Sequence, residues 1–279
     1  MNAVRQARAI ARLDLAEVMR SRWLAASTVA YAVLAAVFVA VGLREAPLLG
    51  FTGSARVVFS LSHALVLLLP LVALTATAPA IGRARDDGSL ELLCAQPLGR
   101  GAYLVAITTV RICAILAPVA AVFVAVALWG AISDGQPVPW AYLARALGVL
   151  AALAWAFAGI GMLISTLVRH PVRMLTYVVV IWAAGVALLD AGLIGVLLRW
   201  RLDAHVVFAL AAANPVEDAR LALLSGIDRD LSTLGPVGFY LVGRLGDAAL
   251  HALGLAIPLA WGTLAWLAAL AHFRRADIT

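Results

Sequence analysis

Six long apolar runs, each bounded by charge, proline or glycine, most constrain what this chain can fold into. They lie near residues 23–43, 57–80, 103–129, 142–167, 174–197 and 248–270. A helix needs about 20 apolar residues to cross a hydrocarbon layer of about 30 Å, and no run alternates as barrel strands do. With 64% hydrophobic residues and a mean hydropathy of +1.00, the chain is too apolar for a water-soluble fold. We predict an all-α polytopic membrane protein, with one six-span domain over residues 1–279.

The distribution of arginine predicts the orientation of these spans. All 21 basic residues are arginine, because the chain contains no lysine. With the N-terminus inside, twelve arginines fall in the cytoplasmic termini and connections, whereas the short outer loops hold only Arg44, Arg56 and Arg145. Arginine-rich connections stay in the cytoplasm, so we expect both termini there. The basic excess then reflects topology, and we expect no nucleic-acid partner.

The first 22 residues predict a helix that lies in the headgroup layer. Val4, Ile10, Leu13 and Val18 fall broadly on one helical side, with most arginines on the other. This helix would meet the first span at an elbow near Arg22. A charged leader without defined structure is the alternative.

A short charged segment, residues 83–101, separates the second and third spans. Asp86, Asp87 and Glu91 cluster where a helical pattern begins, and acidic residues suit the positive end of a helix dipole. The apolar face of that pattern holds Leu90, Leu93, Cys94 and Pro97. A two-turn helix does not persist alone in water, so we expect it to rest on lipid or on a protein partner.

The fifth span carries a stripe of small residues at four-residue spacing. The stripe consists of Ala183, Ala187, Ala191 and Gly195. Small residues let membrane helices approach closely, so the stripe predicts a helix contact, either internal or with a second copy of the chain.

A long outer segment, residues 198–247, follows the fifth span. It contains "NPVEDARLALLSG", in which Asn214 is placed as an N-cap, Pro215 as the first helical residue and Glu217 as the third. Gly226 follows the end of this pattern. We predict a short re-entrant or surface helix, which either docks an external partner or covers the ends of the spans.

Catalytic and metal-binding patterns are missing from the sequence. The phosphate-binding loop of ATPases requires a lysine, so any ATP use must come from another polypeptide. No protease or hydrolase motif occurs, and the scattered Met, Cys and His residues share no metal-ligand spacing. We therefore expect no enzyme activity and no metal site. Arg111, inside the third span, is expected to extend toward the inner surface.

The charged segment resembles the permease subunits of ABC-2 type ATP-binding-cassette transporters. The matching residues are Gly88, Ser89, Leu90, Glu91, Leu92, Leu93, Pro97, Leu98 and Arg100. The resemblance implies a bacterial inner-membrane permease with a type V exporter-like fold, in which residues 86–98 form a coupling helix on an ATPase. Two partner ATPase subunits would bind ATP and magnesium. The coupling residues it implies are Asp86, Asp87, Glu91, Leu93, Pro97 and Arg100.

Four stretches resemble more closely the permeases that support copper-site assembly in nitrous oxide reductase. They are "MNAVRQARAIARLDLAEVMRSRWL", "FTGSARVVFSLSHALVLLLPLVAL", "PLGRG" and "NPVEDARL". This resemblance implies a homodimer and a periplasmic, NosD-like partner on the outer segment, for which Asn214, Glu217 and Arg220 are the candidate contacts. An exporter for lipid, drug or other cargo is the alternative, as is a membrane scaffold that moves nothing.

Overall fold

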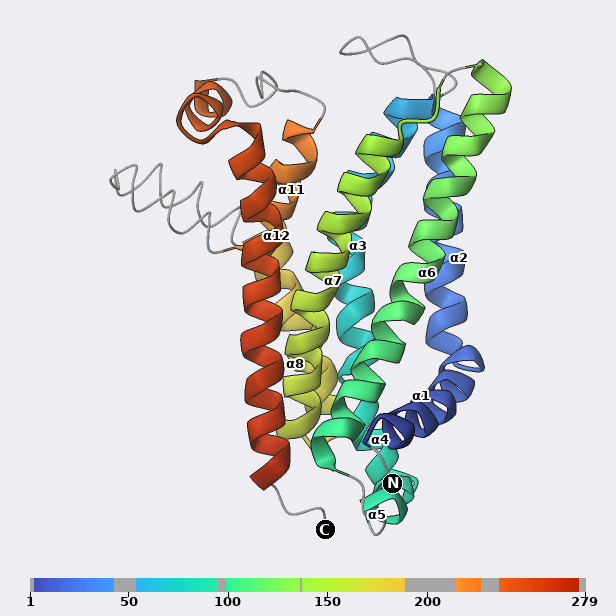
Figure 1. Cartoon of the computed structure of the whole chain (residues 1–279), viewed down its shortest axis with the longest axis vertical. Helices are drawn as coiled ribbons and strands as arrows, with labels where there is room; N and C mark the ends of the chain where they lie inside the picture. The colour runs from blue at the N-terminus through green and yellow to red at the C-terminus, as the bar shows by residue number, and fades with distance from the viewer. Residues whose placement is uncertain are drawn as a thin grey trace.

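The computed structural model describes residues 3–42, 54–94, 99–135, 137–188, 214–226 and 236–275, and its elements run mostly along one axis (Figure 1). In chain order they are α1 (Ala3–Met19), α2 (Arg22–Gly42), α3 (Ser54–Thr77), α4 (Ala80–Asp86), α5 (Ser89–Cys94), α6 (Arg100–Asp134), α7 (Trp140–Leu167), α8 (Pro171–Ala183), the π-helical η1 (Ala184–Leu188), α11 (Pro215–Ser225) and α12 (Pro236–Arg275). Every element in these ranges is helical, which confirms the all-α prediction.

Five described helices are long and apolar enough to cross a membrane. They comprise Arg22–Val41, Val57–Asp86, Arg100–Ser133, Trp140–Leu167 and Gly246–Arg275. These match five of the six predicted spans. The other, expected over 174–197, corresponds to the shorter apolar helix Pro171–Val186, and its part from residue 189 onward lies outside the described residues. The count of six spans stays a prediction.

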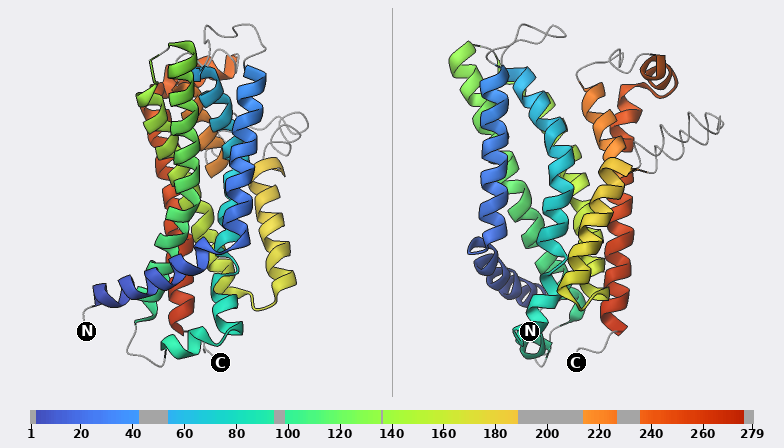
Figure 2. Two further views of the ribbon diagram at one scale, coloured as in Figure 1. Left: turned by 90° about the vertical axis from the view of Figure 1, so that its right-hand side faces the viewer. Right: turned by 180° about the vertical axis from the view of Figure 1, so that it is seen from behind.

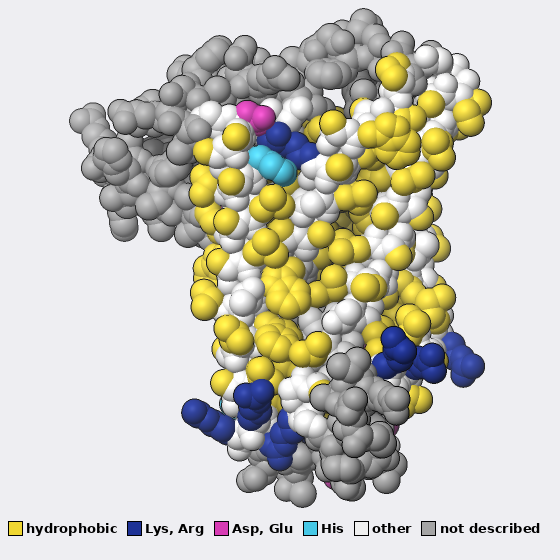
Figure 3. Space-filling view, viewed as in Figure 1, with side chains coloured by type: hydrophobic (Ala, Val, Ile, Leu, Met, Phe, Trp, Pro, Cys, Tyr) yellow, Lys and Arg dark blue, Asp and Glu magenta, His cyan; other side chains and the backbone are white. Residues whose placement is uncertain are grey.

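The long helices form an upright bundle, and α1 lies across its lower end, as expected for the N-terminal elbow helix (Figure 2). The described chain begins and ends at this same lower end (Figure 1). The flank of the bundle is mostly hydrophobic, and arginine side chains gather at the level of α1 (Figure 3). Such a change from apolar to basic surface marks the level of lipid headgroups.

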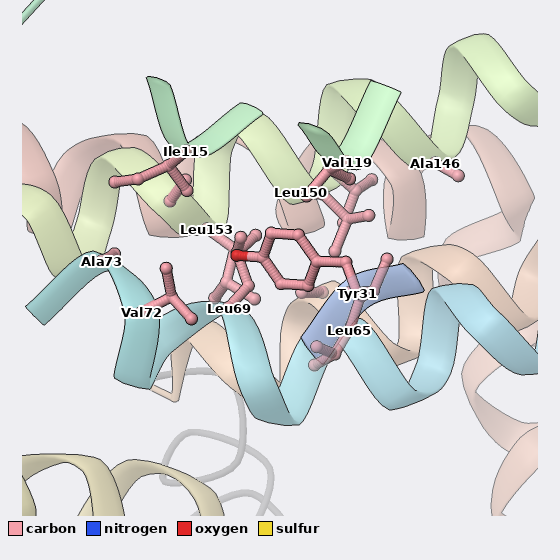
Figure 4. Packing of buried hydrophobic residues seen from close by; sticks show 14 of the residues in the cluster. Tyr31, Leu65, Leu69, Val72, Ala73, Ile115, Val119, Ala146, Leu150 and Leu153 are labelled. Atoms are coloured by element: carbon pink, nitrogen blue, oxygen red, sulfur yellow. The ribbon is translucent and has the colours of Figure 1, made fainter. Parts of the chain in front are cut away.

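The core is built around α7, which packs against α3, α6, α11 and α12. Tyr31 of α2 inserts its ring among aliphatic side chains of α3, α6 and α7 (Figure 4). Its neighbours Leu65, Leu69, Val119 and Leu150 are fully buried, as Tyr31 is. This interdigitation fixes α2 to the rest of the bundle by dispersion contacts.

Glycine permits the close crossing of α7 and α12. A Cβ at Gly159 would clash with the backbone of Gly262, and a Cβ at Gly262 would clash with the backbone of Trp155. The Trp155 indole also donates to Thr263 Oγ1 at 3.1 Å. Close backbone approach is the usual way in which membrane helices gain packing energy in lipid.

A backbone break divides α12 near its upper end. Gly246 has φ 76° and ψ 162°, a conformation that other residues rarely adopt. The apolar, spanning part begins here and continues to Arg275. The break places Asp247 in the first turn of that part, where it faces the beginning of α7.

Candidate functional site

The charged segment folds as two short helices rather than one. Asp86 ends α4, Asp87 follows it, and Gly88 turns the chain with φ 69° before α5 begins at Ser89. The prediction of a continuous helix starting at Asp86 was therefore wrong, because Gly88 breaks it. Of the three acidic residues, only Glu91 lies in the first turn of α5.

Two buried contacts fix α5 against the end of the bundle. Leu90 is fully buried in a lower core with Ile81, Tyr103 and Phe273, from α4, α6 and α12. Ser89 Oγ donates to the Ala84 carbonyl at 3.1 Å, which holds α5 to α4. A six-residue helix thus keeps its place through packing.

Three carboxylates stand on the outside of this α4–α5 hairpin. Asp86, Asp87 and Glu91 are all exposed. Among the other predicted coupling residues, Leu93 lies in α5, while Pro97 lies outside the described residues. The hairpin therefore presents acidic groups to the medium while its apolar side faces the bundle.

Arg100 has an internal role that the sequence did not indicate. Its Nη1 donates to the carbonyl oxygens of Phe273 and Arg274 at 3.1 and 3.0 Å. These carbonyls belong to the last turn of α12, which lacks intrahelical donors. Arg100 thereby joins the start of α6 to the end of α12.

The elbow helix α1 is attached to the bundle by a buried ion pair. Arg111 of α6 is 2% exposed and donates from Nη2 to Asp14 Oδ1 at 3.0 Å, and Asp14 is 7% exposed. A second guanidinium nitrogen donates to the Ala76 carbonyl near the end of α3. Arg111 does point toward the lower end, but the expectation that it reaches the surface was wrong, because Asp14 pairs with it inside the protein.

The same pair corrects the predicted face of α1. Ile10 and Val18 are buried as expected, whereas Leu13 is 65% exposed and Asp14 takes the inward position. Burial raises the pKa of the Asp14 carboxyl above its ordinary value, and Arg111 opposes that shift. Asp14 Oδ2 has no hydrogen-bond partner among the described residues.

An elbow cavity of about 340 Å³ lies beside this ion pair. Its walls come from α1, α4, α5 and α6, and the hydrophobic Ile10, Tyr103 and Ile107 form much of them. Polar groups reach it from Asp14, Glu17, Ser89 and Arg111. A cavity that is mostly apolar, with a few convergent polar groups, has the composition of a small-ligand site.

Helix α11, at the upper end of the bundle, begins as the sequence predicted (Figure 1). Asn214 Oδ1 accepts from the Val216 N–H at 3.0 Å, Pro215 occupies the first turn, and Gly226 follows the end. Asn214 also donates to the Gly185 carbonyl of η1 at 3.0 Å and is 2% exposed. Asn214 is thus buried within this chain and is a cap rather than an exposed contact.

α11 is largely buried between α7, α12 and α3, so it is a docked helix rather than a surface one. Glu217 and Arg220 pair with each other at 3.1 Å and remain partly exposed. Asp218 is 4% exposed, and burial raises its pKa to about 8. Glu217 and Asp218 are adjacent in sequence, yet Glu217 is partly exposed whereas Asp218 is buried.

Arg145 of α7 attaches α11 to the bundle. It donates to Asp247 Oδ1 at 2.7 Å, to Ser225 Oγ at 2.7 Å and to the Ala222 carbonyl at 2.9 Å. Arg145, Ser225 and Asp247 line a second cavity of about 360 Å³ together with Tyr142. An arginine expected in an outer loop is instead the centre of a polar cluster.

The predicted small-residue stripe does not follow one regular α-helix. Ala183 ends α8, and Ala187 lies in η1, where π-helical geometry changes the four-residue register. Ala191 and Gly195 lie outside the described residues. Gly185 of η1 lies close to Phe157 of α7 and Val216 of α11, so η1 makes contacts within the chain.

Two of these clusters were missed from sequence: Asp14 with Arg111, and Arg145 with Asp247. A signal existed for the first, since Ile10, Asp14 and Val18 are spaced four apart and a lone acid on an apolar face requires a partner. Among the described residues, no three His, Cys, Asp or Glu side chains are grouped to hold a metal ion.

Comparisons with known proteins match nearly the whole chain. A family model described as "ABC-2 family transporter protein" matches residues 8–278. The "Probable ABC transporter permease protein NosY" of Stutzerimonas stutzeri is 29% identical over 272 residues, covering 95% of this chain and 97% of that protein. The protein of the same description from Pseudomonas aeruginosa is 39% identical over 95 residues, 34% of each chain.

Proposed function

The chain belongs to the ABC-2 family of transporter proteins, and we propose that it is the permease subunit that couples ATP hydrolysis by separate ATPase subunits to movement across the membrane. Its fold is all helical, with five described helices able to span a bilayer. We further propose an inner-membrane location in which the end carrying α1, α4 and α5 faces the cytoplasm. The arginines of that end support this orientation.

The observation that carries the coupling proposal is the α4–α5 hairpin. Leu90 is buried and Ser89 is bonded to α4, so a force on α5 reaches the lower core instead of moving a free loop. The exposed Asp86, Asp87 and Glu91 are left to contact a partner. A basic groove on each of two ATPase subunits, which also bind ATP and magnesium, would complement them.

The experiment that tests coupling is charge reversal at Glu91. Glu91→Arg should lower the ATPase turnover of the co-purified complex in proteoliposomes, because it places like charges together, while membrane insertion stays unchanged. Arg8→Glu is the control, since it reverses an exposed charge on α1 at the same end. Unchanged turnover and unchanged co-purification in Glu91→Arg would contradict the assignment of α5.

The resemblance to NosY proteins supports a narrower proposal. The chain would act as a homodimer in maturation of the copper or sulfur centre of nitrous oxide reductase, and would transport a component or signal to a periplasmic, NosD-like partner. The partner surface would include Glu217 and Arg220, which stay partly exposed on α11. Neighbouring genes for an ATPase and a periplasmic partner, together with loss of the mature copper site on deletion, would test it.

The alternatives are an ABC-2 exporter for lipid, drug or other cargo, and a scaffold that transports nothing. Stimulation of ATPase turnover by this chain would contradict the scaffold. Reductase that matures normally after deletion of the chain would favour an exporter of other cargo.

A further inference from the structure

The elbow cavity contains an unmet requirement for a hydrogen-bond donor. Asp14 is 7% exposed and lines the cavity, and its Oδ2 has no hydrogen-bond partner among the described residues. A buried carboxylate oxygen without a donor loses its hydration and gains nothing in return. Arg111 does not meet this requirement, because its hydrogen bonds go to Oδ1 of Asp14 and to the Ala76 carbonyl.

Charge in the cavity indicates what kind of donor fits. Two carboxylates, from Asp14 and Glu17, face it, against the single guanidinium of Arg111. The two acids are three residues apart on α1 and so lie on neighbouring turns of one face. The site therefore has an excess negative charge, and a primary ammonium group offers a positive charge with three donors.

The apolar walls and the position of the cavity indicate the rest of the ligand. Most of the cavity lining is apolar, and Ile10, Tyr103 and Ile107 belong to it. α1 crosses the end of the bundle at the level where arginines gather, which is the level of lipid headgroups (Figures 1 and 3). A soluble amine would leave these walls in contact with water, whereas a lipid would cover them.

We propose that the elbow cavity binds phosphatidylethanolamine, with its ammonium group on Asp14 Oδ2 and Glu17 and the first carbons of its acyl chains against the apolar wall. Ala84 and Ser89 of the α4–α5 hairpin also line the cavity, so a bound lipid joins α1 to that hairpin. The proposal does not depend on coupling to an ATPase, because it concerns binding to this chain alone.

The test is native mass spectrometry of the delipidated full chain, with added phosphatidylethanolamine, phosphatidylcholine or phosphatidylglycerol at matched concentrations. Phosphatidylcholine has a quaternary ammonium without N–H donors, and phosphatidylglycerol has no amine. We expect phosphatidylethanolamine to bind roughly tenfold more tightly than phosphatidylcholine, the effect of one charge-assisted hydrogen bond. Equal retention of the three lipids would overturn the proposal.

Two variants locate the binding. Glu17→Gln removes one of the two carboxylates, at an exposed position, and should reduce the headgroup preference without unfolding the chain. Ala84→Leu should fill the cavity and reduce retention of every lipid. Glu91→Gln is the control, since that carboxylate is exposed on α5 and does not line the cavity. If both cavity variants retain phosphatidylethanolamine as well, and prefer it over phosphatidylcholine as strongly, as the unmodified chain does, the proposed site is wrong.

Competition with soluble ethanolamine distinguishes the two sources of the amine. Retention of the lipid in excess ethanolamine supports the lipid as occupant. Displacement by ethanolamine at concentrations similar to those of the lipid would overturn that assignment, because the apolar wall would then contribute nothing.

Discussion

The ion pair between Asp14 and Arg111 gives the sharpest test of how α1 is attached. Arg111→Met keeps much of the side-chain volume but leaves Asp14 buried without its cation and the Ala76 carbonyl without its donor. Removing one partner of a buried pair costs about 3–5 kcal/mol. Protonation of Asp14 limits that cost, because neutralising a carboxyl with an ordinary pKa of 3.8 costs about 4 kcal/mol at pH 7. We therefore expect a loss of about 4 kcal/mol in the free energy of unfolding.

Equilibrium unfolding in mixed micelles, followed by the fluorescence of the eight tryptophans, measures this loss. The double variant Asp14→Leu, Arg111→Met removes both charges and should recover all but about 1–2 kcal/mol, the cost of the unpaired carbonyl. Without Arg111, only burial and the nearby Glu17 carboxylate act on Asp14, and both raise its pKa, so its folded-state pKa rises further above 3.8. The folded protein then binds more protons than the unfolded one, and Arg111→Met should regain stability as the pH falls from 7 toward about 5. A single variant as stable as the wild type, or a double variant no better than the single one, would refute the pairing.

Two further predictions concern helix α11. Arg145→Gln should speed amide hydrogen exchange in Pro215–Ser225 by roughly tenfold, because α11 loses the bonds at Ala222 and Ser225, while the exposed Arg173→Gln should leave exchange unchanged. Equal exchange in the two variants would contradict the role of Arg145. Because burial raises the pKa of Asp218 from 3.8 to about 8, the folded protein holds a proton that the unfolded one releases, so stability should fall as the pH rises from about 4 through 8. Asp218→Asn should make the thermal unfolding temperature depend less on pH over this range. An unchanged pH dependence would contradict the raised pKa of Asp218.

Local signals in the sequence predicted most of the elements. Hydropathy located five of the described spans within a few residues, because each long apolar run has to be helical in lipid. Asn214 and Pro215 predicted the start of α11 correctly, since an N-cap acts within one turn. In the charged segment, Gly88 is a signal for a helix break, whereas the helical spacing of the apolar residues favours one helix. The structure has the break.

Contacts between distant segments were not predictable in the same way. Asp14 and Arg111 are 97 residues apart, and Arg145 and Asp247 are 102 apart. Nothing in either neighbourhood specifies the other partner. The face of α1 was misjudged for the same reason: hydropathy favours Leu13 inward, whereas pairing with Arg111 brings in Asp14, one residue along the helix.

Arg100, Arg111 and Arg145 share one structural role that explains why arginine suits these positions. Each donates to carbonyl oxygens in the last turn of another helix: Phe273 and Arg274 of α12, Ala76 of α3, and Ala222 of α11. Carbonyls in the last turn of a helix lack intrahelical backbone N–H donors and carry the negative end of the helix dipole. The guanidinium also has donors left for a second acceptor, as at Asp14 and Asp247, because its five N–H groups point in fixed directions. A lysine has three donors around one point and does not reach both acceptors. In a chain without lysine, the same arginine side chains therefore hold helix ends and carboxylates together, joining α6 to α1 and α7 to α11.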